Sequence, residues 1–151
     1  MWCDIALAYD PVTRACDVVF AAGGVALDTT PATPVLMSLG AERRAHPDDT
    51  LPDTAAVTGL PASLSARRGW AADAFDALGR RIGSRLWLLS RAKQSEATRL
   101  RAADYVAEAL AWIGAERGIT PQFEVGWARA GVLAVVVYVG TRTISVMQPV
   151  V

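Results

Sequence analysis

Only a few side chains in this sequence have the types and spacing that catalysis requires. Ser90 and Lys93 match S-x-x-K, in which a lysine can activate a serine hydroxyl, but the companion S-D-N and K-T-G motifs are absent. No glycine-rich phosphate loop and no G-x-S-x-G elbow occurs in the chain. The serine and lysine are therefore interpreted as the end of a helix.

Two further patterns that contain acidic residues need the same test. His46 with Asp48 and Asp49 could ligate a metal, but one histidine and two adjacent loop aspartates do not make a tetrahedral set. Asp73 and Asp76 could form an acid/base pair, although this spacing is more typical of an exposed helix face or of partners for nearby arginines. We therefore expect no enzyme activity, no metal and no cofactor.

Arginine and tryptophan together give the strongest chemical signal. Residues 80–95 read RRIGSRLWLLSRAKQS, so one short segment is both very basic and apolar in its middle. Guanidinium groups beside Trp70 and Trp87 could hold phosphates and stack bases. The chain, however, has fourteen arginines against one lysine, and an arginine excess suits forked hydrogen bonds to carboxylates. A nucleic-acid surface, a protein interface and an internal clamp all remain open.

The formal net charge of zero conceals a strong asymmetry along the chain. Residues 1–66 carry three basic and eight acidic side chains, whereas residues 67–101 carry nine basic and three acidic ones. The acidic part would repel a duplex, and it offers carboxylates to the arginines of the basic part.

The elements that must position these side chains are β at both ends and helical between. Residues 3–9 and 14–20 alternate as a hairpin, with Cys3 opposite Phe20, and residues 25–27 predict a third strand. Two cysteines in this register do not predict a disulfide, which suits a reducing compartment.

Helices are predicted in the middle of the chain. Thr33 and Pro34 begin a helix that should run to about Ala45, followed by a flexible loop over about residues 46–62. Short helices are predicted over residues 71–78 and 84–92. Ser95 should cap a long helix that ends at Gly118.

The C-terminal part is β again. Alternation at residues 123–127, the apolar run at residues 132–139 and the apolar positions 144 and 146 predict three strands, the middle one covered on both faces. The fold class is therefore α+β: an N-terminal β meander, central helices including one long helix, and C-terminal antiparallel strands. The length suggests one domain over residues 1–151.

Five motifs follow one another along the chain: DIALAYD (4–10), PVLMSLGAERRAHPDD (34–49), RRGW (67–70), GSRLWLLSRAKQS (83–95) and AADYVAEALAWI (102–113). Their order resembles the Mu-like phage baseplate protein family, the small wedge subunits of contractile tails. The resemblance covers about residues 3–128. The family is similar to the lysozyme-like wedge subunits of other contractile injection systems, which carry a Glu-Arg element at a place comparable to Glu42-Arg43.

The resemblance implies a non-enzymatic virion protein at the tail baseplate, made in the host bacterial cytoplasm. Expected partners are larger baseplate wedge proteins and the tail sheath, with the tail tube as a further candidate, in several copies of a symmetric assembly. Membrane and nucleic acid are not expected partners, and a small arginine-rich nucleic-acid-binding protein is the alternative. The residues expected to act at a partner interface or as a structural clamp are Glu42, Arg43, Arg44, Arg67, Arg68, Trp70, Asp73, Arg85 and Trp87.

Overall fold

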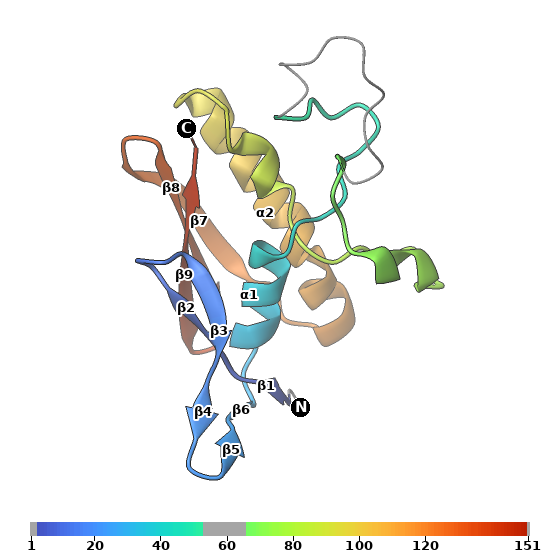
Figure 1. Ribbon diagram of the computed structural model, residues 1–151, viewed down its shortest axis with the longest axis vertical. Helices are drawn as coiled ribbons and strands as arrows, with labels where there is room; N and C mark the ends of the chain where they lie inside the picture. The colour runs from blue at the N-terminus through green and yellow to red at the C-terminus, as the bar shows by residue number, and fades with distance from the viewer. Residues whose placement is uncertain (1–2, 53–65, 151) are drawn as a thin grey trace.

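The computed structural model describes residues 3–52 and 66–150 and confirms the α+β class. Two α-helices, α1 (Ala32–Gly40) and α2 (Glu96–Arg117), lie on one face of a three-stranded antiparallel sheet (Figure 1). The sheet has the order β7 (Gln122–Arg129), β8 (Val132–Val139) and β9 (Arg142–Pro149). The N-terminal strands form a separate set of ribbons beside β9 (Figure 1).

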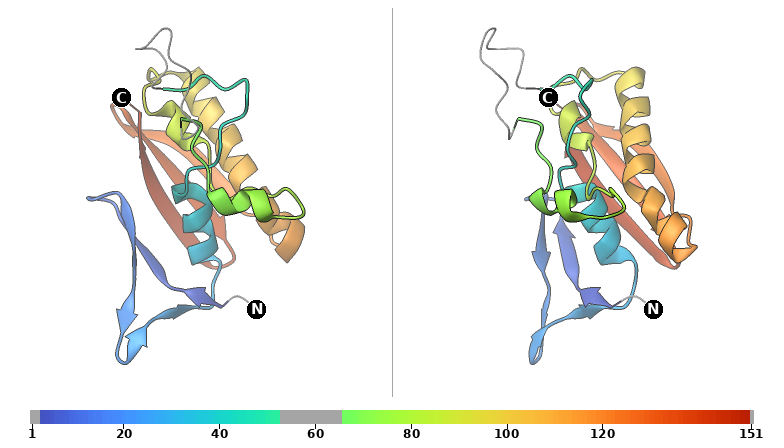
Figure 2. Two further views of the ribbon diagram at one scale, coloured as in Figure 1. Left: turned by 45° about the vertical axis from the view of Figure 1, so that its right-hand side comes forward. Right: turned by 90° about the vertical axis from the view of Figure 1, so that its right-hand side faces the viewer.

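The predicted N-terminal meander is a three-way junction of two-stranded ribbons. The ribbons pair β1 (Asp4–Ile5) with β6 (Leu27–Asp28), β2 (Leu7–Asp10) with β3 (Ala15–Val18), and β4 (Phe20–Ala21) with β5 (Gly24–Val25). At the junction, Ala6 N–H donates to Ala26, Ala26 N–H to Val19 and Val19 N–H to Ala6, each at 2.9 Å. Each strand therefore changes partner at this ring of bonds, which gives the triangular outline in Figure 2.

The predicted register of the first hairpin is wrong. Cys16 lies opposite Tyr9. Phe20 pairs with Val25 instead of lying opposite Cys3. The turn keeps four residues but lies one position later than expected, over residues 11–14, because Asp10 accepts hydrogen bonds from Val12 N–H and the Thr13 hydroxyl, and because Arg14 adopts a left-handed φ of 58°. Both cysteines are exposed free thiols.

Helix α1 begins and ends earlier than predicted, and Thr33 is not its cap. The Asp28 carboxylate accepts from Thr33 N–H at 2.9 Å, so it satisfies a donor in the first turn. The Thr33 hydroxyl instead accepts from Leu7 N–H and donates to the Ile5 carbonyl, which fastens the ribbons to the helix. The helix ends at Gly40 because Ala41 is extended and its carbonyl accepts from Ser84 N–H.

The middle of the chain is less helical than predicted. Residues 71–78 and 84–92 contain only the short 3-10 helices η2 (Ala71–Phe75) and η3 (Leu86–Leu89). The predicted loop over residues 46–62 lies partly outside the described residues, and its described part, residues 46–52, has no helix or strand.

The long helix follows its predicted caps. The Ser95 hydroxyl accepts from Thr98 N–H, and Gly118 ends α2 in the left-handed conformation at φ 66°.

The core lies between the helices and one face of the sheet. Leu133, Val135, Val137 and Val139 of β8 are 0–1% exposed, and they pack with buried side chains of α1, η3 and α2. The expectation that β8 is covered on both faces is wrong. On the other face Ala134 and Val136 are half-buried and Tyr138 is exposed, because both helices lie on the same side.

Tyr9 ties the N-terminal ribbons to the edge of the sheet. Its hydroxyl donates to the Met147 carbonyl at 3.2 Å and accepts from the Met147 N–H at 3.0 Å. One side chain therefore satisfies both backbone groups that Met147 presents at the outer edge of β9.

Replacing Tyr9 with phenylalanine should lower the free energy of unfolding by about 1–2 kcal/mol, because two backbone groups lose their partner. It should also speed amide exchange at Met147, as measured by NMR. The matched control is Tyr138→Phe: Tyr138 is exposed, and its hydroxyl has no partner within the described ranges. Equal unfolding free energies and equal Met147 exchange in the two variants would show that Tyr9 does not tie the ribbons to the sheet.

Candidate functional site

Most of the predicted site residues gather where four segments meet: residues 41–52, residues 66–70, η3 and the middle of α2. Backbone bonds set the framework. Arg43 N–H donates to Ser84 at 3.0 Å, Ser84 N–H donates to Ala41 at 2.9 Å, and Ala45 N–H donates to Arg67 at 2.9 Å. Residues 41–45 are thus held between the strand-like stretch at Ser84 and the segment at Arg67.

Two glycines make this approach possible. A Cβ on Gly83 would lie 2.4 Å from the Ala41 carbonyl oxygen, and a Cβ on Gly69 would lie 2.6 Å from the Arg44 Cβ. Both have left-handed φ angles, +94° and +98°. Any side chain here would separate the segments that carry the arginines.

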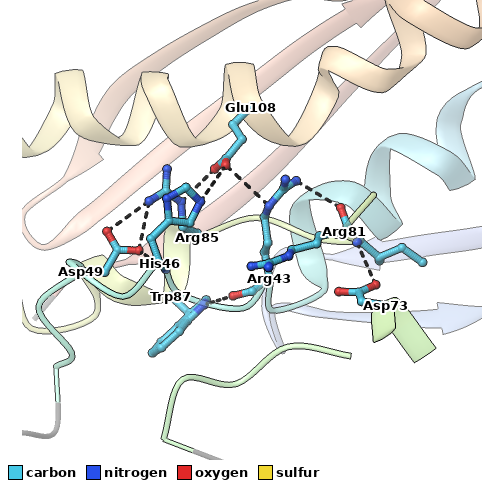
Figure 3. A network of polar contacts seen from close by, with 9 residues as sticks. Arg43, His46, Asp49, Asp73, Arg81, Arg85, Trp87 and Glu108 are labelled. Carbon is cyan, nitrogen blue, oxygen red and sulfur yellow. Dashed lines mark hydrogen bonds and ion pairs between the residues drawn. The ribbon is translucent and has the colours of Figure 1, made fainter. Parts of the chain in front are cut away.

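Arg85 has the densest set of contacts in the site (Figure 3). Its Nε donates to Glu108 at 2.8 Å, and its Nη1 donates to Asp49 at 3.0 Å. The guanidinium also stacks on Tyr105, with its carbon 4.6 Å from the ring centroid. Its side chain is only 15% exposed, so Arg85 links residues 46–52, η3 and α2 through charge-assisted bonds in a largely dry place.

The ionisation of this group follows from its surroundings. Burial raises the pKa of Asp49, but hydrogen bonds from Arg85 and from the His46 N–H outweigh it and hold that pKa below its ordinary value of 3.8. Burial lowers the pKa of Arg85, and its bonds to Glu108 and Asp49 more than offset this. Burial raises the pKa of Tyr105. The aspartate and arginine are therefore both charged at neutral pH.

A second stack lies beside the first. Trp87 is buried, and its Nε1 donates to the Arg43 carbonyl at 2.8 Å. The Arg68 guanidinium lies 4.4 Å above the Trp87 ring and forms an ion pair with Glu42. Trp87 is therefore part of the core, and the face of its ring forms a cation–π contact with Arg68.

The other predicted arginines bond mainly to backbone carbonyls. Arg43 Nη1 donates to Arg81 at 3.1 Å, and its Nε lies 3.6 Å from Glu108. Arg44 donates to the Arg68 carbonyl, and Arg67 donates to the carbonyls of His46 and Pro47. These contacts fix the path of residues 43–47.

Trp70 and Asp73 lie apart from this group. Trp70 is 58% exposed and so does not anchor its segment in the core. The Asp73 carboxylate accepts from Ile82 N–H at 3.2 Å, and no ion pair joins it to Arg67, Arg68 or Arg85 within the described residues.

Sequence reasoning missed Glu108, which contacts Arg43, His46 and Arg85 together. Its signal was its place three residues after Tyr105 on α2, which puts both side chains on the same helix face.

The structure does not build a catalytic site from the candidate residues Ser90 and Lys93. Ser90 and Lys93 lie in the link between η3 and α2, where Ser90 N–H bonds to the Trp87 carbonyl and the Lys93 carbonyl accepts from Thr98. Over residues 3–52 and 66–150, no group of three or more His, Cys, Asp or Glu side chains could hold a metal. Within the same ranges, no helix combines the length and apolar character that crossing a membrane requires.

If Arg85 acts as a clamp, its shape matters as well as its charge. Arg85→Ala should lower the free energy of unfolding by about 2–4 kcal/mol, because Asp49 loses its arginine partner and Glu108 loses one of two. Arg85→Lys should also be clearly destabilising, since one ammonium cannot reach both carboxylates and stack on Tyr105. Urea unfolding measures both. The exposed Arg81→Lys is the control and should change little. A lysine variant as stable as the parent beside a damaged alanine variant would mean that charge alone matters.

The lowered pKa of Asp49 predicts a pH effect. A carboxylate with a depressed pKa stabilises the fold above its unfolded pKa, and this stabilisation is lost as pH falls through the folded pKa. Asp49→Asn should therefore be less stable than the parent at neutral pH, and the gap should close below about pH 4. Unfolding free energies measured across this range test it, with Asn at the exposed neighbour Asp48 as control. A gap that stays constant with pH would contradict the ion pair.

Comparisons with known proteins identify the family. The family described as phage protein GP46 matches residues 31–144, which include every predicted site residue. A curated relative, the baseplate protein gp46 of Escherichia phage Mu, is 44% identical over 86 residues. The alignment covers 57% of this chain and 52% of the relative, so the chain spans about half the length of that protein. No solved structure matches the chain.

The family match extends over most of the chain and confirms the resemblance to Mu-like phage baseplate proteins that the sequence motifs indicated. The chain belongs to the phage protein GP46 family.

Proposed function

We propose that this chain is a structural, non-enzymatic subunit of a phage tail baseplate. More specifically, we propose a small wedge subunit of a contractile tail, which joins larger wedge proteins to the start of the sheath and tube. The observation that carries the proposal is the 44% identity to the Mu baseplate protein, together with the family match over residues 31–144. We also propose that the chain forms one domain, since a single cluster of buried side chains draws on α1, η3, α2 and the sheet.

The arrangement of charges supports this proposal over the nucleic-acid alternative. A phosphate-binding surface needs guanidinium groups that face solvent. Here Arg68 pairs with Glu42, Arg80 with Asp76 and Glu116, and Arg85 with Asp49 and Glu108. Arg68, Arg80 and Arg85 are therefore neutralised by carboxylates of the same chain. Internal ion pairs of this kind hold the segments in a fixed arrangement, which suits a structural subunit.

The edge of β9 is the part of the molecule that best suits joining to a neighbour. In an antiparallel ladder, alternate residues direct their backbone groups away from the paired strand. Met147 does so toward Tyr9, which places the N–H and C=O of Ser145 and Thr143 on the same outer side. Within residues 3–52 and 66–150 no other residue bonds to these outward groups, so β9 can accept a further strand there.

The groove beside this edge gives such a strand room. It has a volume of about 660 Å³ and lies between the β2–β3 ribbon, the C-terminal half of α1 and β9. Its walls include Tyr9, Met37 and Met147. Pro149 at the end of β9 also lines the groove, and because it has no N–H, a strand ladder cannot continue past it. We propose that a strand of a sheath subunit occupies this place.

A single proline tests the edge without removing the strand. Ser145→Pro deletes the outward N–H and leaves the β8–β9 ladder bonds on the other side, whereas truncation from Arg142 would also remove the buried Ile144. With the variant supplied in place of the parent chain during phage growth, we expect the subunit in purified baseplates but few complete sheathed tails. Ser145→Ala is the control and should assemble normally.

Two results distinguish a failure of strand addition at β9 from a failure of the baseplate role. If Ser145→Pro gives sheathed tails as Ser145→Ala does, strand addition at β9 is not the joining mode. If the parent chain is absent from purified tail particles, the baseplate role itself is wrong.

A further inference from the structure

The two edges of the three-stranded sheet are β7 and β9, and the contact of Tyr9 shows which backbone groups point outward at each. Tyr9 bonds to both backbone groups of Met147, so these groups point away from β8. This direction alternates along an antiparallel ladder, so the backbone groups of Val146 point toward its partner Val135. Val135 in turn pairs with Val125, whose backbone groups must then point out of the sheet at the β7 edge.

Arg99, in the first turn of α2, contacts that outer edge. Its Nη1 donates to the Val125 carbonyl at 3.1 Å. Its Nε donates to the Glu96 carboxylate at 2.9 Å, and this ion pair holds the guanidinium beside the edge. A helix side chain therefore satisfies a backbone group that a further strand would otherwise use.

The contact lies at the middle of the β7 edge. The outward positions of β7 are Phe123, Val125 and Trp127, and Arg99 bonds to the second of the three. A bulge between Trp127 and Arg129 ends the regular ladder directly after the third. A strand that paired with β7 would need consecutive outward positions, and Arg99 separates them.

The β9 edge is different because its contact lies toward one end of the strand. Tyr9 covers Met147, which leaves Thr143 and Ser145 as two consecutive outward positions before it. The sheet therefore has one edge that is divided by a charged side chain and one edge with an undivided stretch.

We propose that Arg99 closes the β7 edge against pairing with another strand, which leaves β9 as the accepting edge of this sheet. Charged side chains and bulges are devices by which edge strands avoid such pairing. Without Arg99 the β7 edge is complementary to itself: an axis at Val125 sets Phe123 of one copy opposite Trp127 of the other. Two copies would then join through antiparallel β7 strands as a closed dimer. This inference goes beyond the proposed baseplate role, and it is tested on the purified chain alone.

Replacing Arg99 with methionine tests the proposal, because methionine keeps an unbranched apolar stem and has no hydrogen-bond donor. In sedimentation experiments, Arg99→Met should dimerise at least tenfold more tightly than the parent chain. In hydrogen exchange followed by NMR, the amides of Phe123, Val125 and Trp127 should exchange more slowly as the variant dimerises. Arg101→Met, at an exposed position of the same helix, is the control and should behave as the parent does.

A folded Arg99→Met variant that associates no more tightly than the parent would overturn the proposal. So would a dimer in which exchange of the three β7 amides is unchanged, because the copies would then meet elsewhere. If circular dichroism shows that Arg99→Met does not fold, Glu96→Gln decides, since Glu96 is 67% exposed and its replacement releases Arg99 without changing the core. Glu96→Gln should then dimerise more tightly than the parent, and association equal to that of the parent would overturn the proposal.

Discussion

A guanidinium with little access to water must find carboxylates, and in this fold that requirement falls on Arg85. Its side chain is 15% exposed and bonds to Asp49 on one side and Glu108 on the other. These two carboxylates come from residues 46–52 and from α2, while Arg85 itself stands just before η3. Three segments that share no helix or strand are thereby held in one arrangement, because loss of Arg85 would leave the little-exposed Asp49 carboxylate without its arginine partner.

The basic and apolar character of residues 80–95 is explained by the same arrangement. Side chains of η3 point into the core, where Leu86 and Leu89 are almost fully buried, and Trp87 presents its face to Arg68. Of the arginines before it, Arg80 bonds to Asp76 and Glu116, and Arg85 bonds to Asp49 and Glu108, whereas Arg81 is exposed. The segment can therefore be rich in both residue types, since its buried apolar side chains lie in η3 and its paired arginines lie before η3.

Local rules predicted the parts of the fold that local bonds determine. Ser95 and Gly118 cap α2 as their types require, and the alternation of residues 123–127 predicted β7. The early end of α1 was not predictable in this way, since it depends on Ala41 bonding to Ser84, more than forty residues away. The three-way junction escaped prediction for the same reason: alternation identifies strands but cannot say that they exchange partners at Ala6, Val19 and Ala26.

The candidate site shows the same division. The arginines and Trp87 were recognisable from residue type. Their acidic partners were not, because Asp73 lies near in sequence yet bonds to Ile82, while Glu108 comes from a helix turn that only the fold brings close. Sequence gives the side chains that need partners, and tertiary packing selects the partners.

The central claim is that the arginine-rich segment is a framework internal to the chain, with Arg85 and Glu108 as its closing contact. A double-mutant cycle on these two residues measures that contact directly. The free energies of unfolding of Arg85→Met, Glu108→Gln and the double variant should give a coupling energy of about 1–3 kcal/mol, with the double variant less damaged than the sum of the single ones. A coupling energy near zero would contradict the account, since Arg85 would then contribute nothing through Glu108.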